Sequence, residues 1–372
     1  MIQARFSFGR YLGSIPVVLN LANLVGFSVI ICVVGGQCLS AASQGTISNN
    51  VGIVIIAILA LVISFCGFRV LHWYEMVAWA PAILMITIAT GVGGSNLKNQ
   101  APTEPATAPA VLSFGMIIAS YTIPWACLAS DFTTYFSPQA SSWRIFTYSY
   151  LGLVIPTVLL MTLGAAIGGA IPSIEGWQDA SDAMGAGGVL ALMLEPVGRF
   201  GQFVVVVLAF SLLGNISGTM YSVTLNFQIL LPWLVRVPRY VFSIIVTAII
   251  IPVSIRAAVD FFVNLENFVS IIGYWTASFV GIVVTEHVVF KKGDPVRYDH
   301  DAWNDAKLLP TGIAAIGAAV LCFGLVIPCM EQVWWVGPIA KHTGDIGFEV
   351  AFILSALLYA VFRTIDNKFW KR

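Results

Sequence analysis

The chain has 372 residues, of which 58% are hydrophobic and 10% are charged. A soluble domain carries about 25% charged residues, so this composition indicates an integral membrane protein embedded in a lipid bilayer. The 18 basic and 18 acidic residues give no net charge, and without a basic field we expect no nucleic-acid partner.

Six cysteines and four histidines show no spacing typical of a disulfide framework or a metal site. The cysteines lie mostly inside apolar runs and are interpreted as small core residues. An intramembrane enzyme would need a catalytic set at membrane depth, and the sequence has no GxSxG, GxGD or histidine-box motif. We therefore expect a protein that is not an enzyme and that uses no cofactor.

About ten apolar segments are long enough to span a bilayer, which takes about 20 helical residues. In chain order they lie near 14–41, 51–67, 74–95, 111–130, 145–171, 199–224, 238–256, 261–289, 309–329 and 347–364.

The basic residues indicate an orientation, because cytoplasmic loops carry an excess of Lys and Arg. With a cytoplasmic N-terminus, the basic residues that fall on the outer side are only Lys98, Arg199, Arg256 and Lys341. We therefore expect a single transmembrane domain over 1–372 with both termini in the cytoplasm. Its cytoplasmic parts would be the N-terminal segment 1–13, the loop 290–308 and the tail 365–372. No signal peptide is recognised after Met1.

The first span contains small residues that let neighbouring helices approach closely, namely Gly26, Ser28, Gly35 and Gly36. It also contains Phe27, whose ring could stack on a planar solute. The alternative is an aromatic residue that packs in the core or faces lipid.

The fourth span is interrupted by Pro124, which removes a main-chain hydrogen bond and clashes with the preceding turn. A broken membrane helix exposes main-chain groups that can bind a solute, whereas a simple proline kink does not. The polar and aromatic residues that could contact a solute here are Ser120, Tyr121, Thr122 and Trp125.

The sixth span carries Asn215 in the middle of an otherwise apolar run from Phe203 to Tyr221, with Thr219 one turn further on. A carboxamide is costly in hydrocarbon, and we expect it to loosen the helix around it. Polar groups at membrane depth usually line a cavity or a substrate path. The pattern predicts a transporter that holds a polar, uncharged solute halfway across the bilayer.

Two carboxylates are candidates for proton coupling. Asp131 lies near the inner end of the fourth span, where its position favours the alternative of a pair with Arg144. Glu266 lies within one or two turns of the outer end of the eighth span, where it could be wetted.

Short motifs along the whole chain carry a further signal. They are Gln3-Ala-Arg-Phe-Ser-Phe-Gly9, Gly26-Phe-Ser-Val29, Val34-Gly-Gly-Gln37, Leu71-His-Trp-Tyr-Glu75, Ala78-Trp-Ala-Pro81, Ser130-Asp-Phe-Thr-Thr-Tyr135, Ile272-Gly-Tyr-Trp275, Thr285-Glu-His287, Trp335-Val-Gly-Pro-Ile-Ala-Lys341 and Gly344-Asp-Ile-Gly-Phe-Glu349. In this order they resemble the nucleobase–cation symporter family 1, specifically its fungal purine–cytosine permease branch.

The resemblance implies an all-α, five-plus-five inverted-repeat (LeuT-like) transporter fold that is truncated at the N-terminus, because the family's first two helices have no counterpart. It also implies secondary active transport of purines or cytosine across the plasma membrane by alternating access. The coupling ion would be a proton or, alternatively, sodium. The absent helices leave open a non-transporting or receptor-like protein of the same fold. Neither the base nor the oligomeric state is specified by the sequence.

The family's substrate site implies that a base stacks on Phe27, beside Trp125 or Tyr121. Asn215 and Thr219, with the main chain freed before Pro124, would bind its edge.

Two departures from the family pattern concern this site. The amide that usually follows the third-helix aromatic by four residues is replaced by Ile31. Ile216, Gly218 and Thr219 replace the Asn, Pro and Asn that usually follow the first Asn of the eighth helix. We therefore expect a base specificity that differs from the usual purine–cytosine set.

Overall fold

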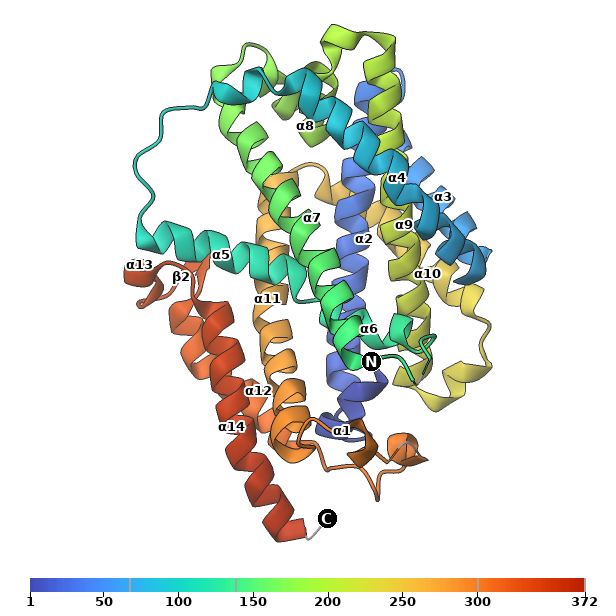
Figure 1. The fold of residues 1–372 in the computed structure, drawn as a ribbon, viewed down its shortest axis with the longest axis vertical. Coiled ribbons are helices and arrows are strands. Elements are labelled where there is room, and N and C mark those ends of the chain that lie inside the picture. Colours follow the sequence, from blue (N-terminus) through green and yellow to red (C-terminus); the bar gives the residue numbers. More distant parts are fainter. Residues whose placement is uncertain (67, 138, 300, 371–372) are drawn as a thin grey trace.

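The computed structural model describes residues 1–66, 68–137, 139–299 and 301–370, and almost all of its regular structure is helical (Figure 1). The long helices are α2 (Ser14–Ala42), α4 (Phe68–Gly93), α7 (Ser142–Ala170), α9 (Arg199–Leu230), α10 (Arg239–Ala257), α11 (Phe261–Thr285) and α14 (Gly347–Trp370). The shorter helices are α1 (Arg5–Phe8), α3 (Asn49–Phe65), α5 (Ala108–Thr122), α6 (Trp125–Thr133), α8 (Trp177–Met193), α12 (Ile313–Val326) and α13 (Ala340–Thr343). Two short strands, β1 (Glu331–Gln332) and β2 (Trp335–Val336), pair antiparallel.

Each predicted span corresponds to a helical segment of the structure. Among the described residues, 8 helices are long and apolar enough to cross a membrane. The predicted spans 51–67 and 309–329 correspond to shorter apolar helices, Asn49–Phe65 and Ile313–Cys329. The predicted all-α membrane architecture is confirmed. The last helix continues to Trp370 rather than ending near 364, so most of the predicted tail is helical, and 371–372 lie outside the described residues.

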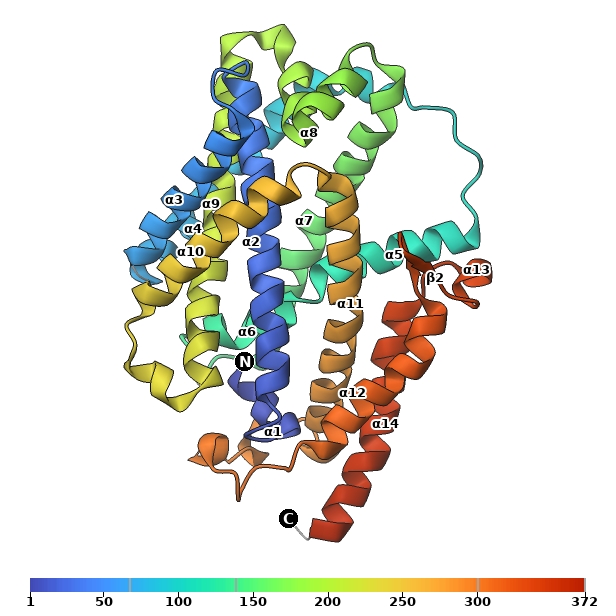
Figure 2. The same ribbon diagram turned by 180° about the vertical axis from the view of Figure 1, so that it is seen from behind.

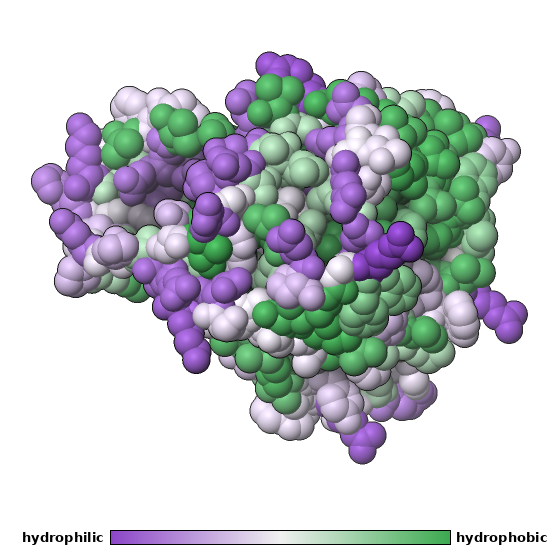
Figure 3. All heavy atoms as spheres, turned by 90° about the horizontal axis from the view of Figure 1, so that it is seen from above, coloured by the Kyte–Doolittle hydropathy of each residue, from purple (hydrophilic) through white to green (hydrophobic). Residues whose placement is uncertain are grey.

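The flanks of the helix bundle are apolar, as a bilayer requires. In α7 the most apolar stretch has no buried residue, and its Val158 and Leu159 are 57% and 65% exposed. Figure 3 shows the molecule from above. Hydrophilic residues gather over the end of the bundle that faces the viewer, and apolar residues cover the flank on the right. Such an extended apolar surface fits contact with lipid rather than water.

Small residues of α2 allow close packing, as predicted. A β-carbon on Gly36 would lie 2.8 Å from the main-chain nitrogen of Ile53 in α3, and one on Gly35 would lie 2.9 Å from the Ile56 side chain. On another face of α2, a β-carbon on Gly26 would lie 2.1 Å from the ring of Phe268. Substitutions here would therefore push α2 away from α3 or α11.

One end of the bundle is held together by Arg5, which is 7% exposed. Its guanidinium donates to the carbonyl of Ile229 at the end of α9 (2.8 Å), to the carbonyl of Trp303 (3.2 Å) and to Oδ1 of Asn304 (2.9 Å). Burial, and then the nearby charge of Arg10, lowers the pKa of Arg5. Because α1 leads directly into α2, these bonds place the start of α2 beside the end of α9.

The α5–α6 segment is arranged differently from the long helices. Both views show α5 lying across α11 rather than along it, with α6 continuing toward α2 (Figures 1 and 2). α5 packs against α11, and α9 packs most extensively against α2. This arrangement brings the proline of the fourth span close to the middle of α2 and α9.

Candidate functional site

A cavity of about 150 Å³ lies where α2, the α5–α6 segment, α9 and α11 meet. Its lining residues are Leu24, Phe27, Ile30, Ile31, Tyr121, Pro124, Trp125, Leu128, Leu212, Asn215, Thr219 and Leu265. It is smaller than the ~300–1,000 Å³ of sites for drug-sized ligands, and so suits a small solute. Phe27 and Asn215 lie near the middle of α2 and α9, which places the cavity at membrane depth.

The aromatic side of the cavity is organised around Phe27. Its ring makes edge-to-face contacts with Tyr121, at 6.1 Å between centroids, and with Phe268, at 5.5 Å. These contacts hold the ring in one orientation, as aromatic pairs of this geometry do. Trp125, one turn after Tyr121, adds a second large aromatic surface to the same wall.

The polar side of the cavity is provided by α9. Asn215 is exposed, and its Oδ1 accepts a hydrogen bond of 3.4 Å from the Thr219 hydroxyl. This bond leaves the Asn215 amide nitrogen as a donor toward the cavity. The expectation that Asn215 loosens its helix is wrong, because α9 is continuous from Arg199 to Leu230 and the carboxamide bonds to Thr219 instead of competing for its own main chain.

The proline of the fourth span separates α5 from α6 by two residues. The amides of Ala126 and Cys127 donate three residues back, to the carbonyls of Ile123 and Pro124, at 3.0 Å each. Both bridging residues keep right-handed helical dihedral angles. The interruption is therefore a tight turn, and the carbonyl of Ser120 loses its usual donor because Pro124 has no N–H.

Ser120 and Thr122 do not line this cavity. Ser120 is fully buried against Gly273 and donates to Sδ of Met116 at 3.5 Å. Thr122 donates to the carbonyls of Ile118 and Ala119 in its own helix. Side chains four positions apart share a helix face, so Tyr121 and Trp125 point into the cavity while their neighbours point aside.

The two predicted coupling carboxylates lie outside the cavity. Asp131 is buried, and its Oδ1 is 3.2 Å from the amine of Met1. The expected pair with Arg144 is wrong, because Arg144 is exposed at the start of α7 while Asp131 faces the segment before α2. Glu266 is exposed and lines a separate pocket of about 640 Å³ with Glu331 and Asp345.

That separate pocket lies between the first turns of α5, the early part of α11 and the β1–α13 segment. Figure 3, seen from above, shows a hollow on the side where α5 and α13 lie. Asp345 accepts hydrogen bonds from the Tyr274 hydroxyl and from the amides of Glu331 and Gly347. Burial nevertheless raises the pKa of the Asp345 carboxyl.

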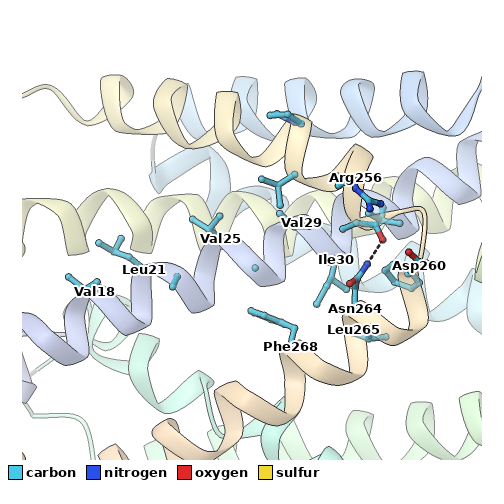
Figure 4. Close-up of a pocket in the computed structure, with 17 residues that line it drawn as sticks. Val18, Leu21, Val25, Val29, Ile30, Arg256, Asp260, Asn264, Leu265 and Phe268 are labelled. Atoms are coloured by element: carbon cyan, nitrogen blue, oxygen red, sulfur yellow. Dashed lines mark hydrogen bonds between the residues drawn. The ribbon is translucent and has the colours of Figure 1, made fainter. Parts of the chain in front are cut away.

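A larger groove of about 1010 Å³ runs along the other face of α2, against α10 and α11 (Figure 4). Its polar residues Arg256, Asp260 and Asn264 gather at one end, where Asn264 donates to the Ala257 carbonyl at 3.1 Å. The rest is apolar and exposed on the flank, which suits lipid chains better than a polar solute. Ile30 and Leu265 line both spaces and separate the groove from the smaller cavity.

Several residues near the site were not predicted. Leu265 brings α11 into the wall, and a single leucine among so many apolar residues gives no signal in the sequence. Ile31 lines the wall at the position where an amide was expected. Glu75 of α4 reaches α9, where its Oε1 lies 3.2 Å from a β-carbon placed on Gly218. A carboxylate inside a membrane span is itself a functional signal, and it could have been found from the sequence.

Comparison with known proteins places this geometry in context. The family described as permease for cytosine/purines, uracil, thiamine and allantoin matches residues 1–304. The purine-cytosine permease fcyB of Emericella nidulans is 34% identical over 379 residues, covering 100% of this chain and 74% of that protein. The purine-cytosine permease FCY2 of Saccharomyces cerevisiae is 32% identical and covers 100% of this chain and 72% of that protein.

A more distant relative and a solved structure extend the comparison. The vitamin B6 transporter TPN1 of Saccharomyces cerevisiae is 26% identical, over 95% of this chain and 70% of that protein. Mhp1, a nucleobase-cation-symport-1 family transporter in a closed conformation with bromovinylhydantoin bound, has a TM-score of 0.68 and 16% identity. The match covers 99% of this chain and 79% of Mhp1, and it confirms the expected LeuT-like transporter fold.

Proposed function

This chain belongs to the family of permeases for cytosine/purines, uracil, thiamine and allantoin, and we propose that it carries a purine or cytosine across a membrane. The observation that carries this proposal is a single cavity that sets the aromatic ring of Phe27 against the amide of Asn215. A neutral base offers a flat π-face and an edge of hydrogen-bond donors and acceptors, which match these two features. Among the described residues no charged side chain lines the cavity, which favours an uncharged solute.

The base would stack beside Phe27, with Tyr121 or Trp125 completing the aromatic surface. Asn215 would bind its edge, assisted by Thr219 and by the carbonyl freed before Pro124. Because Ile31 takes the place of an amide, α2 contributes fewer hydrogen bonds and the preferred base differs from that of the purine–cytosine relatives. Vitamin B6, after which the relative TPN1 is named, is another small heterocycle and should be tested as a competitor of nucleobase uptake.

Transport would proceed by alternating access, as secondary active symport driven by protons, with sodium as the alternative coupling ion. Opposite access states would expose the cavity first to one side of the membrane and then to the other. The chain is an integral membrane protein, and we place it in the plasma membrane with α1 and the end of α14 on the cytoplasmic side.

The proposal is tested by uptake of labelled cytosine, adenine and hypoxanthine in a fungal host without its own nucleobase carriers. We expect saturable uptake by cells expressing this chain, with fcyB as the positive control. A non-transporting protein of the same fold, the less favoured reading, would reach the cell surface and yet show no uptake above the empty host.

Replacing Phe27 by alanine is expected to raise the half-saturating base concentration about tenfold, since stacking of a base on an aromatic ring contributes about 1–3 kcal/mol. Tryptophan at the same position should retain most of the affinity. Phe203→Ala provides the control, because Phe203 lies on α9 outside the cavity and is 54% exposed. Equal losses at Phe27 and Phe203 would exclude a specific stacking role.

Asp131→Asn is expected to remove the pH dependence of concentrative uptake while leaving base-for-base exchange intact. Asp131 is buried one turn beyond Leu128, which lines the cavity, so a change of charge at this side chain can act on the helix that carries Trp125. Glu266→Gln is the matched control, because Glu266 faces the separate outer pocket. Uptake by Asp131→Asn that still responds to pH and to a protonophore would remove Asp131 from the coupling path.

A further inference from the structure

The groove of about 1010 Å³ behind the cavity is long enough to hold a hydrocarbon chain. α2 forms its floor, and α10 and α11 diverge from the corner that joins them to form its two walls (Figures 2 and 4). The floor residues of α2 run from Val18 to Val33, which is roughly 22 Å along the helix axis. Because half of the hydrocarbon core of a bilayer is about 15 Å thick, the groove extends through one leaflet.

The floor of the groove is covered by small and branched residues and faces the membrane. Ala22 is exposed on α2, and Val18 and Val253 are 50% and 45% exposed. A polar solute would find no partner along this surface, whereas a lipid chain loses nothing by lying on it. Exposed apolar surface of this shape therefore fits the tail of a lipid.

The polar end of the groove carries one cation and one anion that form no ion pair with each other. Arg256 and Asp260 are both exposed, and neither has an ion-pair partner in the part of the chain that the structure describes. Asn264, at the same end, donates its amide nitrogen to the Ala257 carbonyl and keeps Oδ1 as an acceptor (Figure 4). A guanidinium binds phosphate well, while a carboxylate and a carbonyl oxygen accept hydrogen bonds from an ammonium group. This end therefore matches a head group that carries both.

The groove shares a wall with the solute cavity. Ile30 and Leu265 line both spaces. Phe268 lines the groove, and its ring meets the Phe27 ring edge-to-face at 5.5 Å between centroids. Gly26 allows this arrangement, because a β-carbon there would lie 2.1 Å from the Phe268 ring. The wall is one layer of side chains, so a molecule in the groove supports it from behind.

We propose that the groove binds one glycerophospholipid with a phosphate–ammonium head group, namely phosphatidylethanolamine, and that this lipid supports the solute cavity. Arg256 binds the phosphate, Asp260 and Oδ1 of Asn264 accept from the ammonium, and an acyl chain lies along α2 against Phe268. A choline head group has no N–H to donate and fits these acceptors less well. When the groove is empty, Phe268 can move into it and release the Phe27 ring. The effect on the solute rests on the proposed transport function, whereas lipid binding does not.

Native mass spectrometry of the purified full chain, stripped of lipid and titrated with phosphatidylethanolamine, tests the binding. We expect one molecule per chain, bound more tightly than phosphatidylcholine or phosphatidylglycerol. Ala22→Trp places a large side chain on the floor and should abolish this binding. Ala165→Trp, at an exposed position of α7 outside the groove, is the matched control and should bind as the parent does. Equal occupancy of the parent and Ala22→Trp, or equal occupancy by the three lipids, would overturn the inference.

The head-group contact is tested by a change that leaves the helix packing intact. Arg256→Ala removes an exposed side chain and is expected to raise the lipid concentration at half-occupancy about tenfold, because a charge-assisted contact with phosphate is lost. Arg199→Ala, exposed at the start of α9 and outside the groove, should leave that concentration unchanged. Unaltered binding by Arg256→Ala would mean that hydrocarbon alone fills the groove, and would refute the assigned head group.

Uptake into proteoliposomes tests the link between the lipid and the cavity. Adding phosphatidylethanolamine to phosphatidylcholine vesicles is expected to lower the half-saturating nucleobase concentration of the parent severalfold, with little effect on Arg256→Ala. An unchanged value for the parent, with the lipid bound, would refute the support of Phe27. If the chain carried no nucleobase, uptake would be absent in every vesicle while the mass spectra would still report the bound lipid, so failure of the proposed function is distinguishable from failure of the lipid site.

Discussion

Asn215→Ala is expected to lower the apparent affinity for the base roughly 10- to 100-fold, or to abolish measurable uptake. A buried hydrogen-bonding group left without its partner costs about 1–3 kcal/mol, and here the unpaired group would be the edge of the base. The alanine also removes the acceptor of the Thr219 hydroxyl, so both polar residues of the cavity are affected together. Uptake of labelled base at several concentrations measures the change.

The control for this variant is Gln202→Ala, which removes a carboxamide from the same helix more than three turns away and outside the cavity lining. It should leave the half-saturating concentration unchanged. Asn215→Asp keeps nearly the same side-chain shape and the oxygen acceptor but removes the amide donor, so it tests whether the donor is needed for binding. Unchanged affinity of Asn215→Ala for every base tested would remove Asn215 from the site.

The sequence predicted the span pattern well, because twenty-residue apolar runs have few alternatives in a bilayer. It also singled out Asn215 by its carboxamide in an apolar run and Phe27 through the family resemblance, and the structure brings both residues to one cavity. What it could not supply was the rotation of each helix about its axis. Ser120 and Thr122 were expected beside Tyr121 in the site, yet neighbouring side chains on a helix point in different directions and only tertiary packing selects the face that is used.

Other differences arise from contacts between distant parts of the chain. The partner of Asp131 depends on the segment before α2, which is remote in sequence. Leu265 enters the cavity wall because α11 crosses near α2, and hydropathy alone cannot distinguish it from a lipid-facing leucine. The prediction that Asn215 weakens its helix failed because Thr219, one turn away, supplies a partner for the carboxamide.

Gly273→Ala is expected to have a large effect on stability and to reduce uptake with it. A β-carbon at this position would lie 1.8 Å from the hydroxyl oxygen of Ser120 and 2.5 Å from its β-carbon, so α5 and α11 could not keep their present separation. Overpacking of this kind typically costs about 1–3 kcal/mol, and α5 carries the Tyr121 wall of the cavity. Thermal unfolding of the purified protein measures the loss. Gly152→Ala in α7, where a β-carbon meets nothing within 4 Å, is the matched control.

A second change at Ser120 tests whether the contact between positions 273 and 120 causes the loss of stability in Gly273→Ala. Ser120→Ala removes only the hydroxyl and should restore part of the stability lost in Gly273→Ala, whereas Ser120→Gly removes the β-carbon as well and should restore more. Contacting residues are expected to couple in this graded way, and distant ones are not. The same variants test the predicted solute contact of Ser120: because its hydroxyl is fully buried, Ser120→Ala alone should leave the half-saturating concentration unchanged. A higher value with unaltered stability would mean that Ser120 touches the solute in another state of the transport cycle, and that its packing against Gly273 is not its main role.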